Sequence, residues 1–375
     1  MLFIKTEDLK VGTRLARPIY SKTGVLLFDR NSLLTAQAID SVRNFGLLGI
    51  YALEPAEPLP PMSEEDLEFE RFQTMTVNSI QEEMNKIITT KSQGRSQMSA
   101  NNIIKNYGYL DSKINFYQNL RSRDDYVFRH SLNVAILCTM ITRIMNIRLE
   151  EQMQIICAAL VHDIGKLNYA SESIYGDVTD AEELQRLFHA QQKGGELIEQ
   201  AFASNGVAIR RICMQALRMQ MGFLTDERIN NNNMKMVTGA KILLVANRYD
   251  EITAMNLQGT AQSEVKAIKE FLDNPEIYEP EVVSALIRSV NILFPGVSIE
   301  LSTGEKAMVL VENKSNILRP TVLSYRDNSI IDLSLAINED IEVVDIMKTL
   351  DNRYIMDNET LAKAGYIKAD ASANE

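Results

Sequence analysis

The stretch Ala158-Ala159-Leu160-Val161-His162-Asp163-Ile164-Gly165-Lys166 decides how the chain is organised. An apolar helical run ends in adjacent His and Asp residues, and a Gly-Lys pair closes the stretch. Imidazole is the commonest borderline metal ligand, and the neighbouring carboxylate adds a hard oxygen ligand. Gly165 permits a sharp exit from the helix, and Lys166 can meet a phosphate or balance the carboxylate. The stretch predicts a metal-assisted phosphohydrolase site; the alternative is a buried polar cluster that holds no ion.

The chain has three histidines, and all of them fall in the region around this stretch. His130 lies upstream, where it opens a second apolar helix as His130-Ser131-Leu132-Asn133-Val134-Ala135, and His189 lies downstream. Surface histidines usually scatter along a sequence. The grouping therefore favours a shared site, with His130 as a partner of His162 and Asp163.

Composition bounds the class of protein and its partners. The 375 residues are 45% hydrophobic and 24% charged, which is typical of a soluble globular protein with two or three domains. The net charge of -11 argues against binding to a nucleic-acid polymer, because no overall positive field exists to release counterions. A local basic pocket for a small anionic ligand is compatible with this charge.

The sequence also bears on location. The N-terminal apolar run is too short for a signal peptide, and no apolar run approaches the roughly 20 residues that a membrane span needs. Three cysteines in apolar helical contexts read as core residues in a reducing compartment. We therefore expect a cytoplasmic protein that does not associate with a membrane.

The first part of the chain reads as two segments without a catalytic cluster. Residues 1–55 predict a small α/β unit that serves as a docking or sensing module. Residues 56–120 begin with a proline-rich linker and continue as connector helices, one of them from about Ala100 to Leu120.

The rest of the chain predicts a mainly α fold. Residues 121–296 are helical almost throughout, with apolar segments at His130–Met145 and Leu149–Val161 that predict buried central helices. Residues 297–350 alternate like short strands and predict a small β appendage. Residues 351–375 form a polar tail, and its last residues, Ala369–Glu375, include no large apolar residue to anchor them.

The helical part, residues 121–296, resembles the HD-GYP family, the bacterial metal-dependent phosphodiesterases of cyclic di-GMP. Asp124–Ser131 is similar to the helix that opens the family's site, and His162-Asp163-Ile164-Gly165-Lys166 matches its name-giving pair with the Gly-Lys that follows. Thr179–Gly195 is similar to the segment that carries the next metal histidine. The resemblance implies an HD-type helical bundle, accompanied by the small N-terminal unit and the β appendage, and a role in cyclic di-GMP signalling.

The resemblance also implies roles for individual residues. The metal ligands are expected to be His130, His162, Asp163 and His189, for a divalent metal of the iron or manganese type that the chain has retained or lost. Asp163 and Lys166 are expected to act in catalysis, and Lys166 also to contact the substrate.

The sequence departs from the family where later ligands belong. The family's His-His-Glu run and its Gly-Tyr-Pro correspond here to Gln215–Met219 and Gln220–Phe223, so two histidine ligands are missing. The late aspartate falls at Asn247, whose neutral oxygen holds a cation more weakly, although Asp250 lies about one turn on and can reach the same face. Arg218 adds a positive charge that attracts phosphate and becomes a candidate substrate-binding residue, with a solvated surface arginine as the alternative.

Two functions stay open, and they decide whether the protein is an enzyme. The first is a degenerate HD-GYP-like protein that regulates by binding a cyclic dinucleotide, a protein partner or a second copy of itself, with little hydrolysis. The second is a phosphodiesterase with a reduced site, in which three protein ligands and a water hydrolyse cyclic di-GMP or a related phosphoester. We favour the first, because a bridged centre of two or three metals lacks its ligands.

Overall fold

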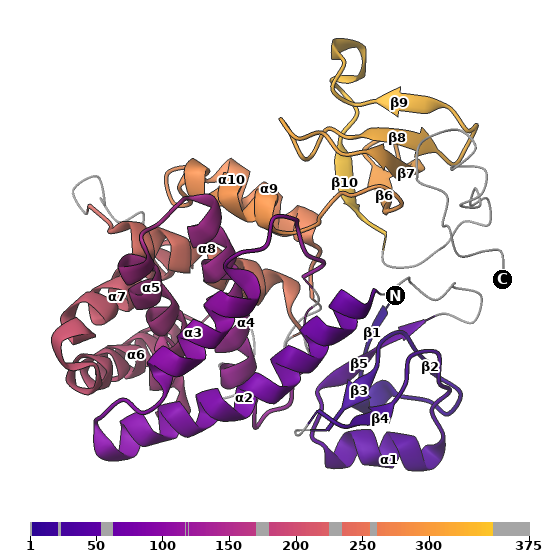
Figure 1. The fold of residues 1–375 in the computed structure, drawn as a ribbon. Helices are drawn as coiled ribbons and strands as arrows, with labels where there is room; N and C mark the ends of the chain where they lie inside the picture. Colours follow the sequence, from indigo (N-terminus) through magenta and orange to yellow (C-terminus); the bar gives the residue numbers. More distant parts are fainter. Residues whose placement is uncertain are drawn as a thin grey trace. The chain divides into compact units, whose positions relative to one another are not determined.

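The computed structural model describes residues 2–21, 24–53, 63–116, 118, 120–169, 180–224, 235–255 and 261–347. The fold is mainly α, as the sequence predicts, with small strands near the N-terminus and a small sheet toward the C-terminus (Figure 1). The chain forms two compact units, one of them made of Leu2–Gln262 with Ala267–Val290. The other comprises Ser263–Lys266 and the chain from Asn291 onward. The five-part division of the sequence stays a prediction.

The larger unit opens with a small α/β module, residues 2–53. Its three-stranded antiparallel sheet has β5 (Gly49–Leu53) between β1 (Leu2–Lys5) and β2 (Arg14–Leu15), and a second pair joins β3 (Ile19–Tyr20) to β4 (Leu26–Phe28). Helix α1 (Ala36–Asn44) is capped by the Thr35 hydroxyl, which accepts a hydrogen bond from the Ala38 amide. The apolar side of α1 packs on the module's core, which includes Leu15, Ile19, Leu34, Val42 and Ile50.

Two helices follow the module. Helix α2 (Glu64–Thr90) begins with a capping box in which Ser63 and Asp66 satisfy each other's backbone amides. Helix α3 (Ser96–Tyr107) ends at Gly108. The predicted helix from Ala100 to Leu120 is therefore wrong beyond Tyr107, because glycine disfavours further helix and the described residues up to Phe116 form turns, bends and an isolated β-bridge at Ile114.

The helical bundle contains α4 (Tyr126–Ile144), α5 (Leu149–Val161), α6 (Ala181–Ala201), α7 (Gly206–Leu224), α8 (Thr238–Thr253), α9 (Glu264–Asp273) and α10 (Pro280–Ser289). Helix α4 is buried along almost its whole length, as its apolar sequence predicts, and packs against α5, α8 and α10. Helix α5 is likewise buried over its last two turns. The first residues of α4 and the end of α5 therefore meet inside the bundle.

A short 3₁₀ turn, η2 (Ile164–Asn168), follows α5 and lies directly on α6. Two glycines permit this contact: a Cβ on Gly194 would lie 2.7 Å from the Gly165 nitrogen, and one on Gly165 would lie 2.5 Å from the Ala190 oxygen. No larger residue fits at either position without moving main chain. The pair of glycines fixes the path of the chain just after His162 and Asp163.

The smaller unit contains an antiparallel five-stranded sheet in the order β10-β6-β7-β8-β9. Its strands are β6 (Ser298–Leu301), β7 (Lys306–Val311), β8 (Thr321–Ser324), β9 (Ile330–Asp332) and β10 (Val343–Ile346). Among the described helices, none combines the length and the apolar character that crossing a membrane requires.

Candidate metal centre

Three of the four predicted metal ligands converge where α4 and α5 meet. One ligand atom each from His130, His162 and Asp163 lies within 4.8 Å of the others. The two Nε2 atoms are 3.3 Å apart, and His130 Nε2 lies 3.4 Å from Asp163 Oδ2. His130 sits one turn into α4, His162 caps α5, and Asp163 follows in the turn.

Each imidazole is oriented by a hydrogen bond at its other nitrogen. His130 Nδ1 lies 2.6 Å from Asp250 Oδ2, and His162 Nδ1 lies 2.7 Å from the Ala159 carbonyl oxygen. Both partners are acceptors, so both Nδ1 atoms carry the proton and donate it. The lone pairs of both Nε2 atoms then point at the centre, as in metal-bound histidines that are held by a carboxylate or a carbonyl. Burial keeps the pKa of His162 below its usual value, which favours this neutral form.

Asn247, from α8, contributes a third acceptor. Its Oδ1 lies 2.9 Å from Nε2 of both His130 and His162. The amide orientation follows from the other end, because Asn247 Nδ2 donates to Gln220 Oε1 at 2.7 Å and to Glu251 Oε1 at 3.0 Å. A carboxylate only accepts, so the nitrogen faces Glu251 and the oxygen faces the histidines.

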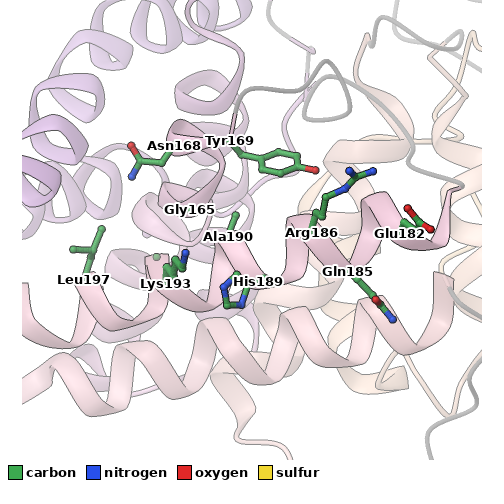
Figure 2. A pocket seen from close by; sticks show the side chains of 11 residues that line it. Gly165, Asn168, Tyr169, Glu182, Gln185, Arg186, His189, Ala190, Lys193 and Leu197 are labelled. Carbon is green, nitrogen blue, oxygen red and sulfur yellow. The ribbon is translucent and has the colours of Figure 1, made fainter.

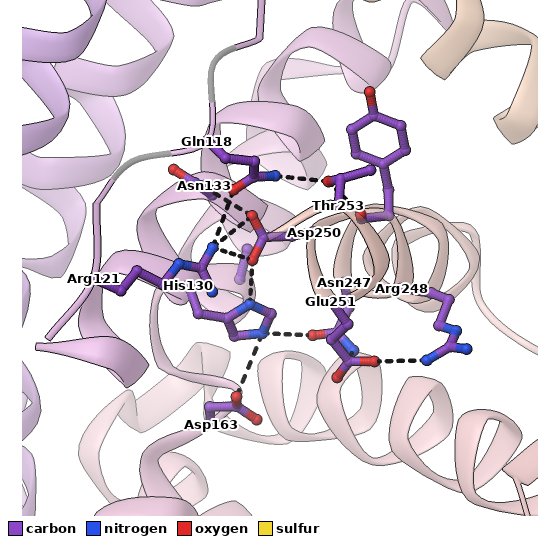
Figure 3. Close-up of polar contacts among 12 residues, drawn as sticks. Gln118, Arg121, His130, Asn133, Asp163, Asn247, Arg248, Asp250, Glu251 and Thr253 are labelled. Carbon is purple, nitrogen blue, oxygen red and sulfur yellow. Dashed lines mark hydrogen bonds and ion pairs between the residues drawn. The ribbon is translucent and has the colours of Figure 1, made fainter. Parts of the chain in front are cut away.

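With neutral histidines, the centre brings together acceptor atoms that repel one another. Figure 3 shows the contacts of His130 with Asn247 and Asp163. Two imidazole lone pairs and an amide oxygen lie within hydrogen-bond distance, and the carboxylate of Asp163 lies beside them. Such a set is stabilised when one positive charge occupies it, either a metal ion or an extra proton on an imidazole. The nitrogen and oxygen donors suit a divalent transition metal.

Lys166 and Gln191 hold the carboxylate of Asp163. The Lys166 ammonium lies 2.6 Å from Asp163 Oδ2, and Gln191 Nε2 donates to Oδ1 at 2.5 Å. Burial by itself would raise the pKa of Asp163, but Lys166 and the two imidazoles outweigh it and hold this pKa below its usual range. Burial would lower the pKa of Lys166, and Asp163 reverses that, so the net shift is upward. The pair is charged at neutral pH.

Behind His130 lies a fully buried ion pair. Arg121 Nη2 donates to both oxygens of Asp250, at 2.9 and 2.6 Å, and both side chains are 0% exposed. Asn133 Nδ2 also donates to Asp250, at 2.8 Å. From the sequence, Asp250 was one residue that could reach the metal-facing side in place of Asn247. The structure instead places it against the opposite nitrogen of His130, where it orients the ring.

His189 lies outside this group. It is exposed on α6, where it lines a separate pocket (Figure 2). The α6 residue that contacts Asp163 is Gln191. Residues two positions apart on a helix are rotated by about 200° around its axis, so residues 189 and 191 face nearly opposite sides. Arg218 is exposed on α7 and is not among the residues that contact the centre in the described part of the chain.

Sequence reasoning missed Gln191, Gln220 and Glu251. Glutamine and glutamate are ordinary residues of solvated helix faces, so composition gave no signal for them. One signal did exist for Gln191: the Gly194-Gly195 pair marks where α6 approaches the turn after Asp163, and Gln191 lies one helical turn before it.

The helical region that carries this centre is similar to known proteins. The family model for the HD domain matches residues 127–252. A curated relative, the cyclic di-GMP phosphodiesterase PA4108 of Pseudomonas aeruginosa, is 24% identical over 214 residues, which cover 54% of this chain. The match covers 49% of that relative, so this chain spans about half of its length. A solved structure, the HDGYP protein Bd1817 of Bdellovibrio bacteriovorus, aligns with a TM-score of 0.42 and 14% identity over 76% of this chain and 97% of that one.

Proposed function

We propose, from the premise that this chain is an HD-domain protein of the HD-GYP family, that it acts in bacterial cyclic di-GMP signalling mainly by binding rather than by hydrolysis. The observation that carries the proposal is the donor set around Asp163. Around the two histidines and Asp163, the neighbouring described side chains are the amides of Gln191, Gln220 and Asn247, the ammonium of Lys166 and, behind Asn247, the carboxylate of Glu251.

The three neutral amides and the Lys166 ammonium limit how many cations the centre holds. His130, His162, Asp163 and the Asn247 oxygen fit one divalent metal. A second metal beside Asp163 requires the Lys166 ammonium to leave, although it already neutralises that carboxylate at 2.6 Å. Hydrolysis by paired metals depends on clamping both the attacking and the leaving oxygen. A centre restricted to one cation therefore favours retention of a ligand over its cleavage.

A cyclic dinucleotide is the ligand that we propose for this centre. The curated relative is named for its action on cyclic di-GMP, and the proposal carries that ligand class over to this chain. An anionic ligand also suits the local chemistry, because Lys166 keeps a charged ammonium at the edge of the centre. A protein partner or a second copy of the chain is the expected recipient of the signal, and a cytoplasmic location stays a prediction.

The alternative is a slow, metal-dependent phosphodiesterase. The converging acceptors support it, because both Nε2 lone pairs and a carboxylate are already oriented toward one point. A metal bound there would supply a Lewis acid and lower the pKa of a bound water.

The experiment that separates the two functions measures three quantities on the purified protein. Metal content is determined after incubation with Mn²⁺ or Fe²⁺ without oxygen, and cyclic di-GMP binding and its conversion to linear product are followed in parallel. We expect at most one metal per chain, measurable binding, and negligible turnover. Turnover that disappears in the double variant His162→Ala with Asp163→Ala would establish the enzyme instead.

A gain-of-ligand variant sharpens the result. Asn247→Asp with Gln191→His replaces two neutral amides by metal ligands that the family favours, and we expect the metal content to rise. The matched control changes exposed residues on α3 and α6, Asn102→Asp with Gln200→His, and is expected to leave the metal content unchanged. A wild-type protein that already holds two or more metals would contradict the proposal.

A further inference from the structure

A second pocket lies on α6, apart from the metal centre. Its volume is about 770 Å³, within the range of small-molecule sites. One wall is the turn η2 with Asn168 and Tyr169, and the other is one face of α6. None of His130, His162, Asp163 or Asn247 lines it.

Main chain separates this α6 pocket from the metal centre. Gly165 and Gly194 line its floor, and their backbones pack so closely that a side chain on Gly194 would meet the Gly165 nitrogen. The neighbouring Lys166 sends its ammonium to Asp163 on the inner side. Gln191, which contacts Asp163, is likewise absent from the lining.

The α6 face presents a row of basic groups to the pocket. Arg186, His189 and Lys193 follow one another at helical spacing, so they share one side of the helix. Lys193 has no ion-pair partner in the part of the chain that the structure describes. Arg186 is 63% exposed and lies 3.3 Å from Glu183. An exposed ion pair of this kind contributes little to stability, so a ligand can replace Glu183 at small cost. In a chain of net charge -11, this local row is unusual.

An aromatic ring faces the basic row. Tyr169 is half-buried at the pocket wall, and Figure 2 shows its ring extending toward the Arg186 guanidinium. Asn168 adds an amide on the same wall, and Glu182 contributes one negative charge at the end of the row. The cavity therefore combines cations for a phosphate with a ring and an amide for a planar, hydrogen-bonding base.

We propose that the α6 pocket binds a nucleotide, with its phosphate on Arg186 and Lys193 and its base against Tyr169. This site is distinct from the cyclic dinucleotide site proposed above and does not depend on a metal. The η2 wall of the pocket belongs to the same turn that carries Lys166, so a bound nucleotide contacts the element that shapes the metal centre.

The test is calorimetric titration of the full chain with GMP and with AMP, in EDTA so that the metal centre does not contribute. Inorganic phosphate and guanosine serve as partial ligands. We expect one site for the nucleotide, weaker binding of either part, and an affinity that falls as salt rises. Arg186→Glu with Lys193→Glu replaces attraction by repulsion and is expected to lower the affinity by about tenfold or more.

Three further variants locate the ligand. Lys105→Glu with Arg43→Glu changes exposed charges on other helices and is expected to leave the affinity unchanged. Tyr169→Leu is expected to reduce nucleotide affinity toward that of phosphate alone. His162→Ala alters the metal centre and is expected to retain nucleotide binding, even if cyclic di-GMP binding is lost.

Three results would overturn the α6 site. These are absence of nucleotide binding at millimolar concentration, binding unaffected by the double charge reversal, and binding lost in His162→Ala but retained in the double reversal. Binding of an acidic peptide to a protein that binds no nucleotide would assign the row to a protein partner and would also reject the proposal. None of these results bears on whether the metal centre binds or hydrolyses cyclic di-GMP.

Discussion

At the scale of single residues, the metal centre depends on hydrogen bonds that decide which atoms donate and which accept. His130 illustrates this, because Asp250 fixes its Nδ1 proton and so directs Nε2 inward. Asp250 is in turn fixed by Arg121, a fully buried guanidinium. Burial alone would raise the pKa of Asp250, but Arg121 and His130 hold it below its usual range.

This buried pair predicts a specific loss of stability. Asp250→Asn leaves Arg121 charged, buried and without a carboxylate, which should cost about 3 to 5 kcal/mol of the free energy of unfolding at pH 7. Chemical denaturation measures it. The control is Asp40→Asn, whose pair with Arg43 is exposed and should cost less than about 1 kcal/mol.

The same variant predicts a change in pH dependence. A carboxyl whose folded pKa is lowered stabilises the fold above its unfolded pKa of about 4, and the stabilisation is lost as pH falls through the folded pKa. The free energy of unfolding of the wild type should therefore fall more steeply below about pH 4 than that of Asp250→Asn. The difference in unfolding free energy between the two proteins should narrow as the pH falls. An equal gap at pH 3 and pH 7 would show that Asp250 is not held ionised by the fold.

At the scale of elements, the contact of η2 with α6 shapes both the metal centre and the α6 pocket. The turn brings Asp163 and Lys166 inward, and its outer side forms the wall of the α6 pocket. The contact is main chain on main chain, through Gly165 and Gly194. Adjacent Gly195 faces a different neighbour, the flexible side chain of Met214.

The two adjacent glycines predict opposite tolerances. Gly194→Ala would place Cβ 2.7 Å from the Gly165 nitrogen, so the backbone must shift, at a cost of about 1 to 3 kcal/mol. Gly195→Ala meets the Met214 sulfur at 3.0 Å, which can move, and alanine favours helix by about 1 kcal/mol. Thermal unfolding of both variants tests this. Similar midpoints for the two variants would mean that η2 does not pack on α6 as described.

At the scale of the whole molecule, the chain divides into two compact units. The larger one joins the N-terminal module to the bundle through the connector around Arg121. The Arg121 carbonyl accepts from the Leu48 amide at 2.8 Å, while the Arg121 side chain binds Asp250. The smaller unit has its own sheet, with Val309 and Val322 paired and fully buried.

Because the chain forms two compact units, a substitution in the core of one unit is expected to destabilise that unit and leave the other intact. Val322→Ala removes buried methyl groups from the sheet and should destabilise it by about 1 to 3 kcal/mol. Hydrogen exchange should then accelerate in β7 and β8 while α4 and α5 keep their protection. The matched variant Val282→Ala, buried in α10, should show the reverse pattern. Equal acceleration in both regions after either change would indicate a single cooperative unit.

The sequence by itself determined the helical class, the buried central helices α4 and α5, and the likeness to HD-GYP proteins. It could do so because apolar period and the His-Asp-Ile-Gly-Lys stretch are local features. It also indicated that His130, His162, Asp163 and Lys166 share a site, and the structure brings these four together. Their proximity follows from two apolar helices that must be buried side by side.

Only the tertiary structure decided which face of each remaining helix meets that site. It turned Gln191 inward and His189 outward on α6, and it placed Asp250 behind His130 instead of beside the metal ligands. A helical sequence fixes the angle between residues but not the rotation of the helix in the bundle. That rotation depends on distant contacts, here the Gly165–Gly194 approach and the buried charge of Arg121, which leave no periodic trace in the sequence.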